Sequence, residues 1–352
     1  MKTYLVTGGA GFIGSNFVHY MLGKYDDIKL INIDALTYAG NPENLKAVEN
    51  DPRYTFIKGD ICDKELIAKI FAENEIDYVV NFAAESHVDR SISDPDIFVK
   101  SNVLGTVNLL NNARKAWSVG DDVYREGVKY LQVSTDEVYG TLGAEGYFTE
   151  TTPLDPHSPY SSSKASADMF VKAYGDTFKL PFNITRCSNN YGPYQFPEKL
   201  IPLIMNNTLK HKELPVYGDG MQIRDWLYVE DHCKAIDMVI NDGVLGEVYN
   251  VGGHNERTNI FIVKTIIEYI KENADDTVGE HLIKHVADRK GHDRRYGIDP
   301  KKIKNDLGWY PETPFEVGIK KTLKWYLDNK EWIANVTSGE YTKYYEKMYK
   351  NK

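Results

Sequence analysis

Residues 3–17, TYLVTGGAGFIGSNF, join an apolar strand pattern to a helix pattern through a turn rich in glycine. Gly8 would allow the tight turn, Gly11 would let a diphosphate approach the backbone, and Gly14 would let the helix pack closely on the strand. The free N–H groups at the start of the helix favour a negative charge. Asp34 ends the next apolar run, 20 residues after Gly14, where an acid would bind ribose hydroxyls. This spacing predicts a dinucleotide site.

Asp34 also favours NAD over NADP, because its carboxylate would repel a ribose phosphate and residues 33–37 contain no arginine. Asp60 and Ile61 follow the third apolar run and could contact the adenine. Asp60 has an equally plausible alternative role, as the N-cap of the next helix. Residues 81–84, Asn-Phe-Ala-Ala, end the fourth run with small side chains, against which a cofactor could lie.

The first half of the chain alternates short apolar runs with longer amphipathic segments. Such alternation predicts an α/β fold with a doubly wound, parallel Rossmann-type sheet. We expect strands at residues 3–7, 28–34, 54–57, 77–84, 129–134 and 182–187, and helices at 12–23, 63–74, 95–117 and 159–179.

Beyond Asn189 the pattern loosens, and residues 189–200 are rich in proline, glycine and aromatics, which suggests an ordered loop that faces a ligand. Residues 228–240 and 248–253 resemble a helix and a strand that return to the first sheet. We therefore expect a Rossmann domain of residues 1–187 plus 228–253, and a smaller, interleaved C-terminal substrate domain of residues 188–227 plus 254–352. In the second part we expect helices near 198–210, 229–241, 260–273, 300–307 and 315–328, and strands near 215–217, 248–251 and 283–287.

Composition narrows the class of protein. The chain has 352 residues, 42% of them hydrophobic, and a net charge of -9, which argues against a nucleic-acid partner and suits a cytoplasmic protein. We find no apolar run of the length that a membrane helix needs and expect no secretory signal. Cys62, Cys187 and Cys233 are widely spaced and read as reduced structural thiols. His281 and His285 lie in a predicted strand, too far apart to share a metal.

Tyr160 and Lys164 are spaced four residues apart on a predicted helix and therefore share a face. A lysine ammonium together with a positive nicotinamide can lower the pKa of a tyrosine, so that the phenolate acts as a base. The pair follows the fifth strand, in a chain that already carries the glycine turn, and this position gives the match its weight.

Ser134, Thr135, Asp136 and Glu137 stand at the carboxyl end of the fifth strand, where ligands bind in open α/β sheets. Thr135 could hydrogen-bond a substrate oxygen. Neighbouring carboxyl groups in different environments can hold opposite protonation states and act as an acid and a base. A solvated acidic turn is an equally good interpretation from residue chemistry alone.

Taken together, these motifs resemble the extended short-chain dehydrogenase/reductases, and within them the dTDP-glucose 4,6-dehydratases. The likeness covers essentially the whole chain, and the Asp136-Glu137 pair is its most specific feature. It rests on GGAGFIGSNF (8–17), AAESHVDRSI (83–92), QVSTDEVYG (132–140), SPYSSSKASAD (158–168), CSNNYGPYQFPEKLIP (187–202), IRDWLYVEDH (223–232) and DRKGHDRRY (288–296).

The resemblance implies roles for individual residues. It makes Thr135 the contact of the sugar hydroxyl that is oxidised, Asp136 the acid and Glu137 the base of a dehydration, with Tyr160 and Lys164 completing the catalytic set. NAD positions are Gly8, Gly11, Phe12, Ile13, Gly14, Asp34, Leu36, Thr37, Asp60, Ile61, Ala83, Ala84, Ser101, Tyr160, Lys164 and Asn190. Positions for dTDP-glucose are Ser86, Thr135, Asn189, Lys199, Leu200, Pro215, Tyr217, Arg224, Asn259, Asp293 and Tyr296.

The implied reaction is oxidation at sugar carbon 4, loss of water across carbons 5 and 6, and reduction at carbon 6 with recycled NAD and no metal. The resemblance also implies deoxysugar synthesis, such as that of rhamnose, and a homodimer formed through the helices near 95–117 and 159–179. A sugar-nucleotide epimerase, a dehydratase of a UDP- or CDP-sugar, a non-catalytic NAD sensor and a net dehydrogenase remain alternatives. The tyrosine-rich tail, residues 341–349, is expected to pack as a helix.

Overall fold

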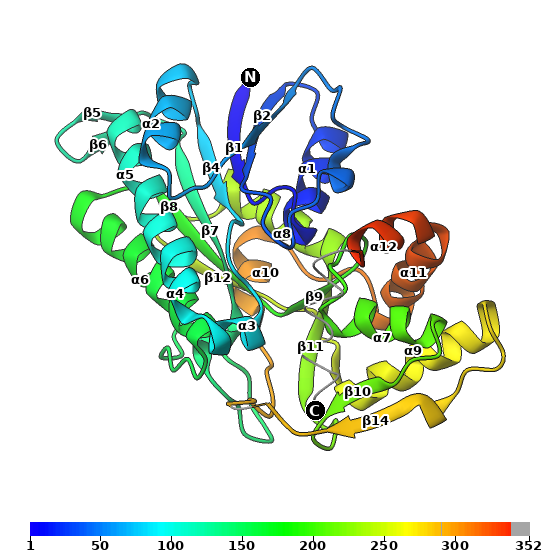
Figure 1. Ribbon diagram of the computed structural model, residues 1–352. Coiled ribbons are helices and arrows are strands. Elements are labelled where there is room, and N and C mark those ends of the chain that lie inside the picture. The colour runs from blue at the N-terminus through cyan, green and yellow to red at the C-terminus, as the bar shows by residue number, and fades with distance from the viewer. Residues whose placement is uncertain (290, 339–352) are drawn as a thin grey trace.

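The computed structural model describes residues 1–289 and 291–338, so the tail prediction for residues 341–349 lies outside the described residues. Its centre is a parallel seven-stranded sheet in the order β12-β8-β7-β4-β1-β2-β3 (Figure 1). The predicted α/β Rossmann-type fold is confirmed. The strands are β1 (Lys2–Thr7), β2 (Ile28–Asp34), β3 (Tyr54–Lys58), β4 (Tyr78–Asn81), β7 (Lys129–Thr135), β8 (Phe182–Cys187) and β12 (Val248–Val251).

Helices cover both faces of this sheet, and the strand sequences show why. In β1, Tyr4 and Val6 belong to one apolar core and Leu5 to the other, as the two-residue period of a strand requires. The first core receives α1 (Phe12–Lys24) and α8 (Val229–Asp242), and the second receives α2 (Lys64–Glu73), α5 (Gly105–Trp117) and α6 (Pro159–Phe178).

The predicted return to the sheet is confirmed. β12 pairs in parallel with β8, and α8 packs against α1 on the face opposite α5 and α6. The later helix α10 (Lys301–Leu307) joins them, because Ile303 is fully buried in the same core.

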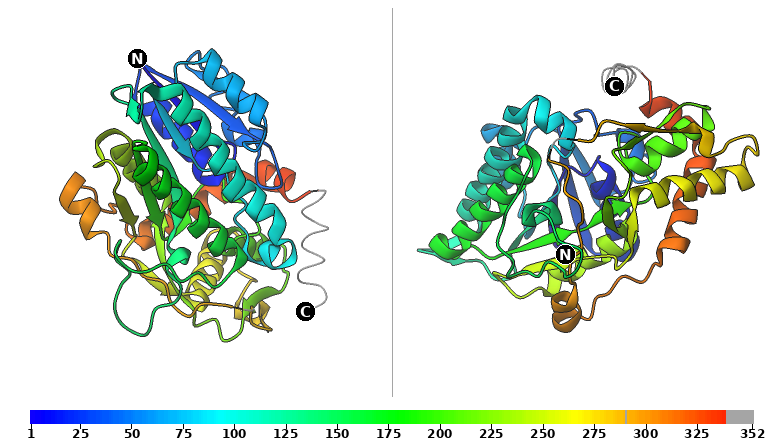
Figure 2. Two further views of the ribbon diagram at one scale, coloured as in Figure 1. Left: turned by 90° about the vertical axis from the view of Figure 1, so that its left-hand side faces the viewer. Right: turned by 90° about the horizontal axis from the view of Figure 1, so that it is seen from below.

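A separate apolar core holds the smaller, C-terminal part together, and Figure 2 shows this part beside the carboxyl ends of the main strands. Its helices are α7 (Leu200–Leu209), α9 (Asn259–Asn273), α11 (Phe315–Asp328) and α12 (Lys330–Val336). Its strands pair as β10 (Leu214–Tyr217) with β14 (Ile283–Val286), and as β9 (Asn189–Tyr191) with β11 (Ile223–Tyr228) and β13 (Glu256–Thr258).

Two predicted elements were wrong in extent. The strand expected at 77–84 ends at Asn81, because Ala83 leaves the sheet and its N–H donates to Thr7 Oγ1 at 3.2 Å. The single helix expected at 95–117 is divided into α4 (Pro95–Phe98), a π-helical turn η2 (Val99–Leu104) and α5. The π turn contains the buried Asn102, whose side-chain amide binds both backbone groups of Glu85.

Several short elements had no counterpart in the prediction, mainly because each is too brief to show a period. They are the 3-10 turns η1 (Pro42–Leu45), η3 (Asp136–Tyr139) and η4 (Glu280–Leu282), the helices α3 (Val88–Ser93) and α12, the hairpin of β5 (Ser118–Gly120) and β6 (Val123–Tyr124), and strands β9, β11 and β13.

Candidate active site

The glycine turn joins β1 to α1 in a conformation that excludes side chains. Gly8 has φ +70°, and a Cβ there would lie 2.7 Å from the backbone of Ala83. A Cβ on Gly14 would lie 2.3 Å from the carbonyl oxygen of Gly8. These contacts give the predicted roles of Gly8, in the turn, and of Gly14, in helix packing, a steric basis.

Sequence reasoning missed Gly9 and its partner Asn32. A Cβ on Gly9 would meet the Asn32 side chain at 2.3 Å, and Asn32 Oδ1 accepts the N–H of Gly9 at 3.0 Å. A polar residue in the otherwise apolar run of β2 was the available signal.

Asp34 faces the glycine turn from the end of β2. Its Oδ2 accepts the N–H of Ala10 at 2.9 Å and its Oδ1 accepts the N–H of Leu36 at 2.8 Å. Burial raises the pKa of Asp34, while these two hydrogen bonds act in the opposite direction. The carboxylate is therefore fixed in orientation, and each oxygen keeps acceptor capacity for a ligand hydroxyl.

The alternative role for Asp60 is excluded. The N-cap of α2 is Asp63, whose carboxylate accepts the N–H groups of Glu65 and Leu66. Asp60 instead accepts the N–H of Cys62 at 2.8 Å and lines the cavity described next.

One cavity of about 300 Å³ runs from the glycine turn to the catalytic candidates. Among the predicted NAD positions, Leu36 lies outside its lining. The lining includes Gly8, Gly11, Phe12, Ile13, Gly14, Asp34, Thr37, Asp60, Ile61, Ala83, Ala84, Ser101, Tyr160, Lys164 and Asn190. Of the predicted substrate positions it includes Ser86, Thr135, Asn189 and Lys199. The loop after β9 contributes Gln195, Phe196 and Glu198 to the lining, which is consistent with the expectation that residues 189–200 face a ligand.

Tyr160 and Lys164 occupy the start of α6, which Ser158 caps. Lys164 Nζ donates to the carbonyl oxygen of Val133 at 2.7 Å, which ties this face of the helix to β7. Burial raises the pKa of Tyr160 well above its ordinary value, Glu137 adds to the rise, and a hydrogen bond with Thr135 opposes it. The sequence argument gave Lys164 a part in lowering this pKa. In the protein without NAD, Lys164 is not one of the main groups that shift the pKa of Tyr160.

Asp136 and Glu137 lie in η3, directly after β7, and both line the cavity. Asp136 is 1% exposed, so the interpretation as a solvated acidic turn is wrong. Burial raises the pKa of Asp136 well above its ordinary value, and the charges of Glu137 and Asp225 raise it further.

Glu137 has a different environment from its neighbour. Burial raises its pKa too, but the cations Arg224, Lys199 and Arg289 act against that rise. The pKa of Asp136 is therefore raised well above its ordinary value, whereas the rise at Glu137 is opposed by three cations.

The remaining predicted substrate residues lie outside the lining of this cavity. Arg224, in β11, lies 4.2 Å from the ring centroid of Tyr296 and donates to the carbonyl oxygen of Asp293 at 2.9 Å. Tyr296 in turn donates to Asp293 Oδ2 at 2.5 Å. Leu200 begins α7, Pro215 lies within β10, and Asn259 begins α9.

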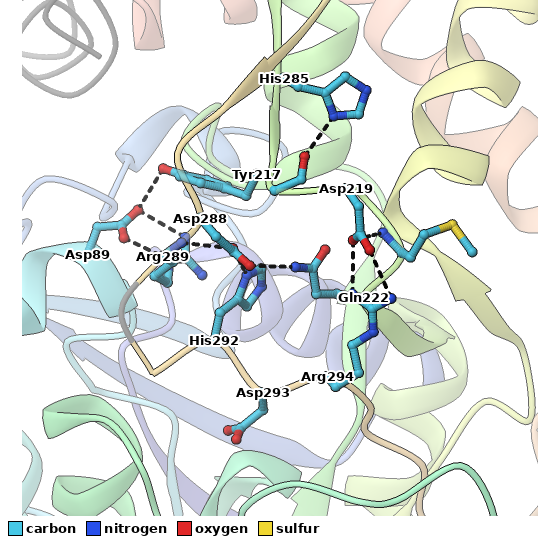
Figure 3. Close-up of polar contacts among 12 residues, drawn as sticks. Asp89, Tyr217, Asp219, Gln222, His285, Asp288, Arg289, His292, Asp293 and Arg294 are labelled. Atoms are coloured by element: carbon cyan, nitrogen blue, oxygen red, sulfur yellow. Dashed lines mark hydrogen bonds and ion pairs between the residues drawn. The ribbon is translucent and has the colours of Figure 1, made fainter.

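Figure 3 shows a polar cluster that sequence reasoning missed, next to the predicted residues Tyr217 and Asp293. Arg289 binds Asp89 of α3 through Nε at 2.7 Å and through Nη2 at 2.9 Å, and Tyr217 donates to the same carboxylate at 3.2 Å. Within residues 288–293, His292 also pairs with Asp288 at 2.6 Å. These contacts connect α3, which follows β4 of the main sheet, with β10 and with Arg289 of the C-terminal part.

Two features are absent from residues 1–289 and 291–338. In that part of the chain, no group of three or more His, Cys, Asp or Glu is arranged to hold a metal ion. No helix in those two ranges has the length and apolar character needed to cross a bilayer.

A Rossmann sheet, a glycine turn and a Tyr-x-x-x-Lys helix that share one cavity define a short-chain dehydrogenase/reductase. The profile of the family described as GDP-mannose 4,6 dehydratase matches residues 5–322. A dTDP-glucose 4,6-dehydratase of Xanthomonas campestris pv. campestris is 52% identical over 344 residues, which cover 97% of each chain.

Two solved structures extend this likeness. A dTDP-glucose 4,6-dehydratase of Bacillus anthracis, in complex with NAD, is 51% identical with a TM-score of 0.86, covering 96% of this chain and 100% of that one. The corresponding enzyme of Streptomyces venezuelae, with NAD and TYD bound, is 45% identical with a TM-score of 0.86, covering 94% and 98%. The chain belongs to the dTDP-glucose 4,6-dehydratase family.

Proposed function

We propose that this protein converts dTDP-glucose to dTDP-4-keto-6-deoxyglucose and water, with NAD that is recycled in each turnover. The observation that carries this proposal is the position of Asp136 and Glu137. Both carboxyl groups line the same cavity as Thr135 and Tyr160, and the charges around them differ: Glu137 and Asp225 raise the pKa of Asp136 further, while Lys199 and Arg289 oppose the rise at Glu137. An oxidation alone would need Tyr160 and Lys164 but no such pair.

The residues around the glycine turn fit NAD. The missing Cβ atoms of Gly8 and Gly14 let β1, α1 and Ala83 approach closely, and Gly11 is the N-cap of α1, where free N–H groups suit a diphosphate. We propose that Asp34 accepts hydrogen bonds from the adenine ribose. When bound, NAD would take the hydride from carbon 4 of the sugar and return it to carbon 6.

We assign the proton transfers of the oxidation to Tyr160, with Thr135 as its partner. Thr135 and Tyr160 line the same cavity, and Thr135 acts to lower the pKa of Tyr160, so we assign both residues to the sugar hydroxyl on carbon 4. Burial holds the proton on Tyr160 in the protein alone, and a positive charge on the bound cofactor would favour the phenolate. Lys164, anchored to Val133, lies on the same face of α6 and would add to that effect.

The elimination follows from the carbonyl group formed at carbon 4, which acidifies the hydrogen on carbon 5. Glu137 removes that proton as a carboxylate, and the C5–H electron pair forms the C5–C6 double bond as the C6–O bond breaks. Asp136 donates its proton to the departing hydroxyl, which leaves as water. After reduction at carbon 6, Glu137 returns a proton to carbon 5. The site is ready for the next substrate once Tyr160 has released to solvent the proton taken from the carbon 4 hydroxyl and Asp136 has taken up a proton from solvent.

Incubation of the purified protein with dTDP-glucose and, separately, UDP-glucose, without added NAD, tests this function. We expect mass spectrometry to show loss of one water from the dTDP-sugar. An unchanged mass with a new sugar stereoisomer would identify an epimerase, and steady accumulation of free NADH would identify a net dehydrogenase. Water loss from UDP-glucose alone would correct the nucleotide.

We propose two interleaved domains, with residues 1–187 plus 228–253 binding NAD and residues 188–227 plus 254–352 binding the sugar nucleotide. The separate apolar core of α7, α9 and α11 supports this division. The burial of Ile303 in the first core shows that the second part is also attached to the Rossmann sheet.

We also propose a homodimer formed through α4, η2 and α6. Helix α6 packs against both α4 and η2, and together they expose large apolar side chains. Leu104 is 58% exposed, Met169 62% and Phe170 42%, which is unusual for a surface that stays in contact with water. Light scattering should give twice the chain mass, and Leu104→Glu with Met169→Glu should reduce it to one chain. Leu245→Glu, at a residue 56% exposed elsewhere, is the control.

The finer biological setting follows from the family rather than from the geometry. We propose a cytoplasmic enzyme whose product enters deoxysugar synthesis, with rhamnose as the first pathway to examine. Loss of rhamnose from the cell surface on deletion of the gene, restored by the wild-type gene, would support that assignment.

A further inference from the structure

A buried side-chain network connects the helix that carries Tyr160 to the turn that carries Asp136 and Glu137. At its centre is Arg186, a residue of β8. Neither the glycine turn nor the Tyr160–Lys164 motif gives Arg186 a role. Arg186 Nε donates to Asp168 Oδ2 at 2.9 Å, and Arg186 Nη1 donates to Tyr139 Oη at 3.0 Å. The Arg186 and Asp168 side chains are 7% and 1% exposed.

Each end of the network belongs to one half of the catalytic set. Asp168 lies on α6 one turn after Lys164 and two turns after Tyr160. Tyr139 is the last residue of η3, the four-residue turn that begins with Asp136. The planar guanidinium of Arg186 therefore spans the gap between α6 and η3 with two hydrogen bonds of fixed relative direction.

The same network reaches the neighbouring strand β12, which lies beside β8 (Figure 1). Tyr139 Oη donates to Asn250 Oδ1 at 2.8 Å, and Asn250 stands in register with Arg186. The ring of Tyr139 also stacks on Phe148 at 5.0 Å. Tyr139 thus anchors η3 to β8 and β12, whereas the start of α6 has anchors of its own in Ser158 and Lys164.

We propose that Arg186, acting through Tyr139, is a positioning residue that sets the place of Asp136 and Glu137 relative to Tyr160, and so controls elimination more than oxidation. This inference rests on the proposed function. The proposed role requires no contact between Arg186 and the substrate.

Tyr139→Phe tests the proposal because it keeps the ring and removes the hydroxyl that binds Arg186 and Asn250. On mixing the NAD-loaded variant with dTDP-glucose, we expect reduction of bound NAD at nearly the wild-type rate. Water loss should be about 10- to 100-fold slower, the range that a small misplacement of catalytic groups produces. The absorbance of bound NADH should therefore rise and persist. Arg186→Lys, which keeps the charge but loses the planar fork, should give the same separation of the two rates.

Tyr4→Phe is the matched control. Tyr4 is also buried, and its hydroxyl donates to Asn241 Oδ1 at 3.1 Å, on β1 and outside the cavity lining. Tyr4→Phe should lose a comparable hydrogen bond but leave the rates of NAD reduction and of water loss in their wild-type ratio. Equal slowing of oxidation and elimination in Tyr139→Phe, or no slowing beyond that of Tyr4→Phe, would overturn the proposal.

Crystal structures keep this test distinct from the test of the function. If the wild-type protein removes no water from dTDP-glucose, the proposed function fails. The crystal structures then decide the positioning role of Arg186 and Tyr139. Displacement of Asp136 and Glu137 relative to Tyr160 in Tyr139→Phe supports it, and an unmoved turn η3 refutes it.

Discussion

At the scale of single residues, the site separates two carboxyl groups that adjoin in sequence. Asp136 faces negative neighbours, Glu137 and Asp225, while Glu137 faces the cations Arg224, Lys199 and Arg289. Two acids with the same intrinsic chemistry thereby stand in different electrostatic surroundings, which suits the acid and base roles proposed for them. Substitutions of single residues test the roles proposed for Tyr160, Asp136 and Asp34.

Tyr160→Phe and Asp136→Asn should block different steps. Loss of a general base or acid typically costs about 100- to 10,000-fold. Tyr160→Phe should bind NAD but barely reduce it when dTDP-glucose is added. Asp136→Asn cannot donate the acid proton, so it should reduce bound NAD and then lose water slowly. Stopped-flow absorbance of NADH, with mass analysis of the product, distinguishes the two. Water loss by Asp136→Asn at the wild-type rate would remove Asp136 from the acid role.

The buried carboxyl of Asp136 should also be visible in the pH dependence of stability. Its pKa is raised well above the ordinary 3.8, so the folded chain binds this proton at pH values where the unfolded chain has released it. Wild type should therefore lose unfolding free energy as pH rises from 3.8 towards the folded-state value. Asp136→Asn carries no such proton, so its stability relative to wild type should increase across that range. Urea titrations at several pH values measure this difference, and a constant difference would contradict the raised pKa.

Asp34→Ala should weaken NAD binding. A hydrogen bond to a charged group contributes about 1.5–3 kcal/mol, so we expect a roughly ten- to hundredfold higher Kd by calorimetry. Asp63→Ala is the control, because Asp63 caps α2 and lies outside the cavity lining. It should lower thermal stability and leave the NAD affinity unchanged. An Asp34→Ala protein with wild-type affinity would show that another residue binds the ribose.

At the scale of elements, the sequence predicted what depends on a long regular pattern. The main strands and helices α1, α2, α6, α8, α9 and α11 have clear apolar periods and were found with small errors at their ends. The π turn at Val99–Leu104 was not predictable from period, because it depends on Asn102 reaching the backbone of Glu85, a contact made only in the folded chain. The pairings of Arg289 with Asp89 and of Arg186 with Asp168 were missed for the same reason, since their partners are distant in sequence.

The strand–turn–helix unit gives a prediction at this scale. Gly14→Ala places a methyl group 2.3 Å from the Gly8 carbonyl oxygen, so α1 must shift away from the turn. Both the NAD affinity and the unfolding free energy should fall. Gly23→Ala lies in the same helix with open space around the new methyl group. It should instead raise stability by about 0.5–1 kcal/mol, through better helix propensity, with no change in NAD affinity. Equal effects of the two substitutions would contradict the steric account of the turn.

At the scale of the whole molecule, one cavity joins the NAD residues of the main sheet to the loop after β9 and to the substrate residues. Its walls come from the glycine turn, β2 and β7 on one side and from Gln195, Phe196 and Glu198 on the other. Tyr38 and Phe196 meet edge to face at 5.8 Å, and Arg90 pairs with Glu198 at 3.3 Å, so side chains from both parts of the chain cross beside the cavity. A cavity shared by the NAD positions and the catalytic residues suits a cofactor that stays bound through oxidation, elimination and reduction.

Recycling of NAD within one site predicts that the hydride stays with its own sugar molecule between carbon 4 and carbon 6. Substrate deuterated at carbon 4 should give product deuterated at carbon 6. Carbon 5 should take its hydrogen from solvent, because Glu137 can exchange its proton with water before the return step. A mixture of deuterated and ordinary substrate should give little crossover of label, since each bound NAD is re-oxidised before its sugar departs. Mass spectrometry and NMR of the product measure both sites. Label found in free NADH, or scrambled between substrate molecules, would show that the cofactor exchanges during turnover and that the reaction is not the recycling dehydration.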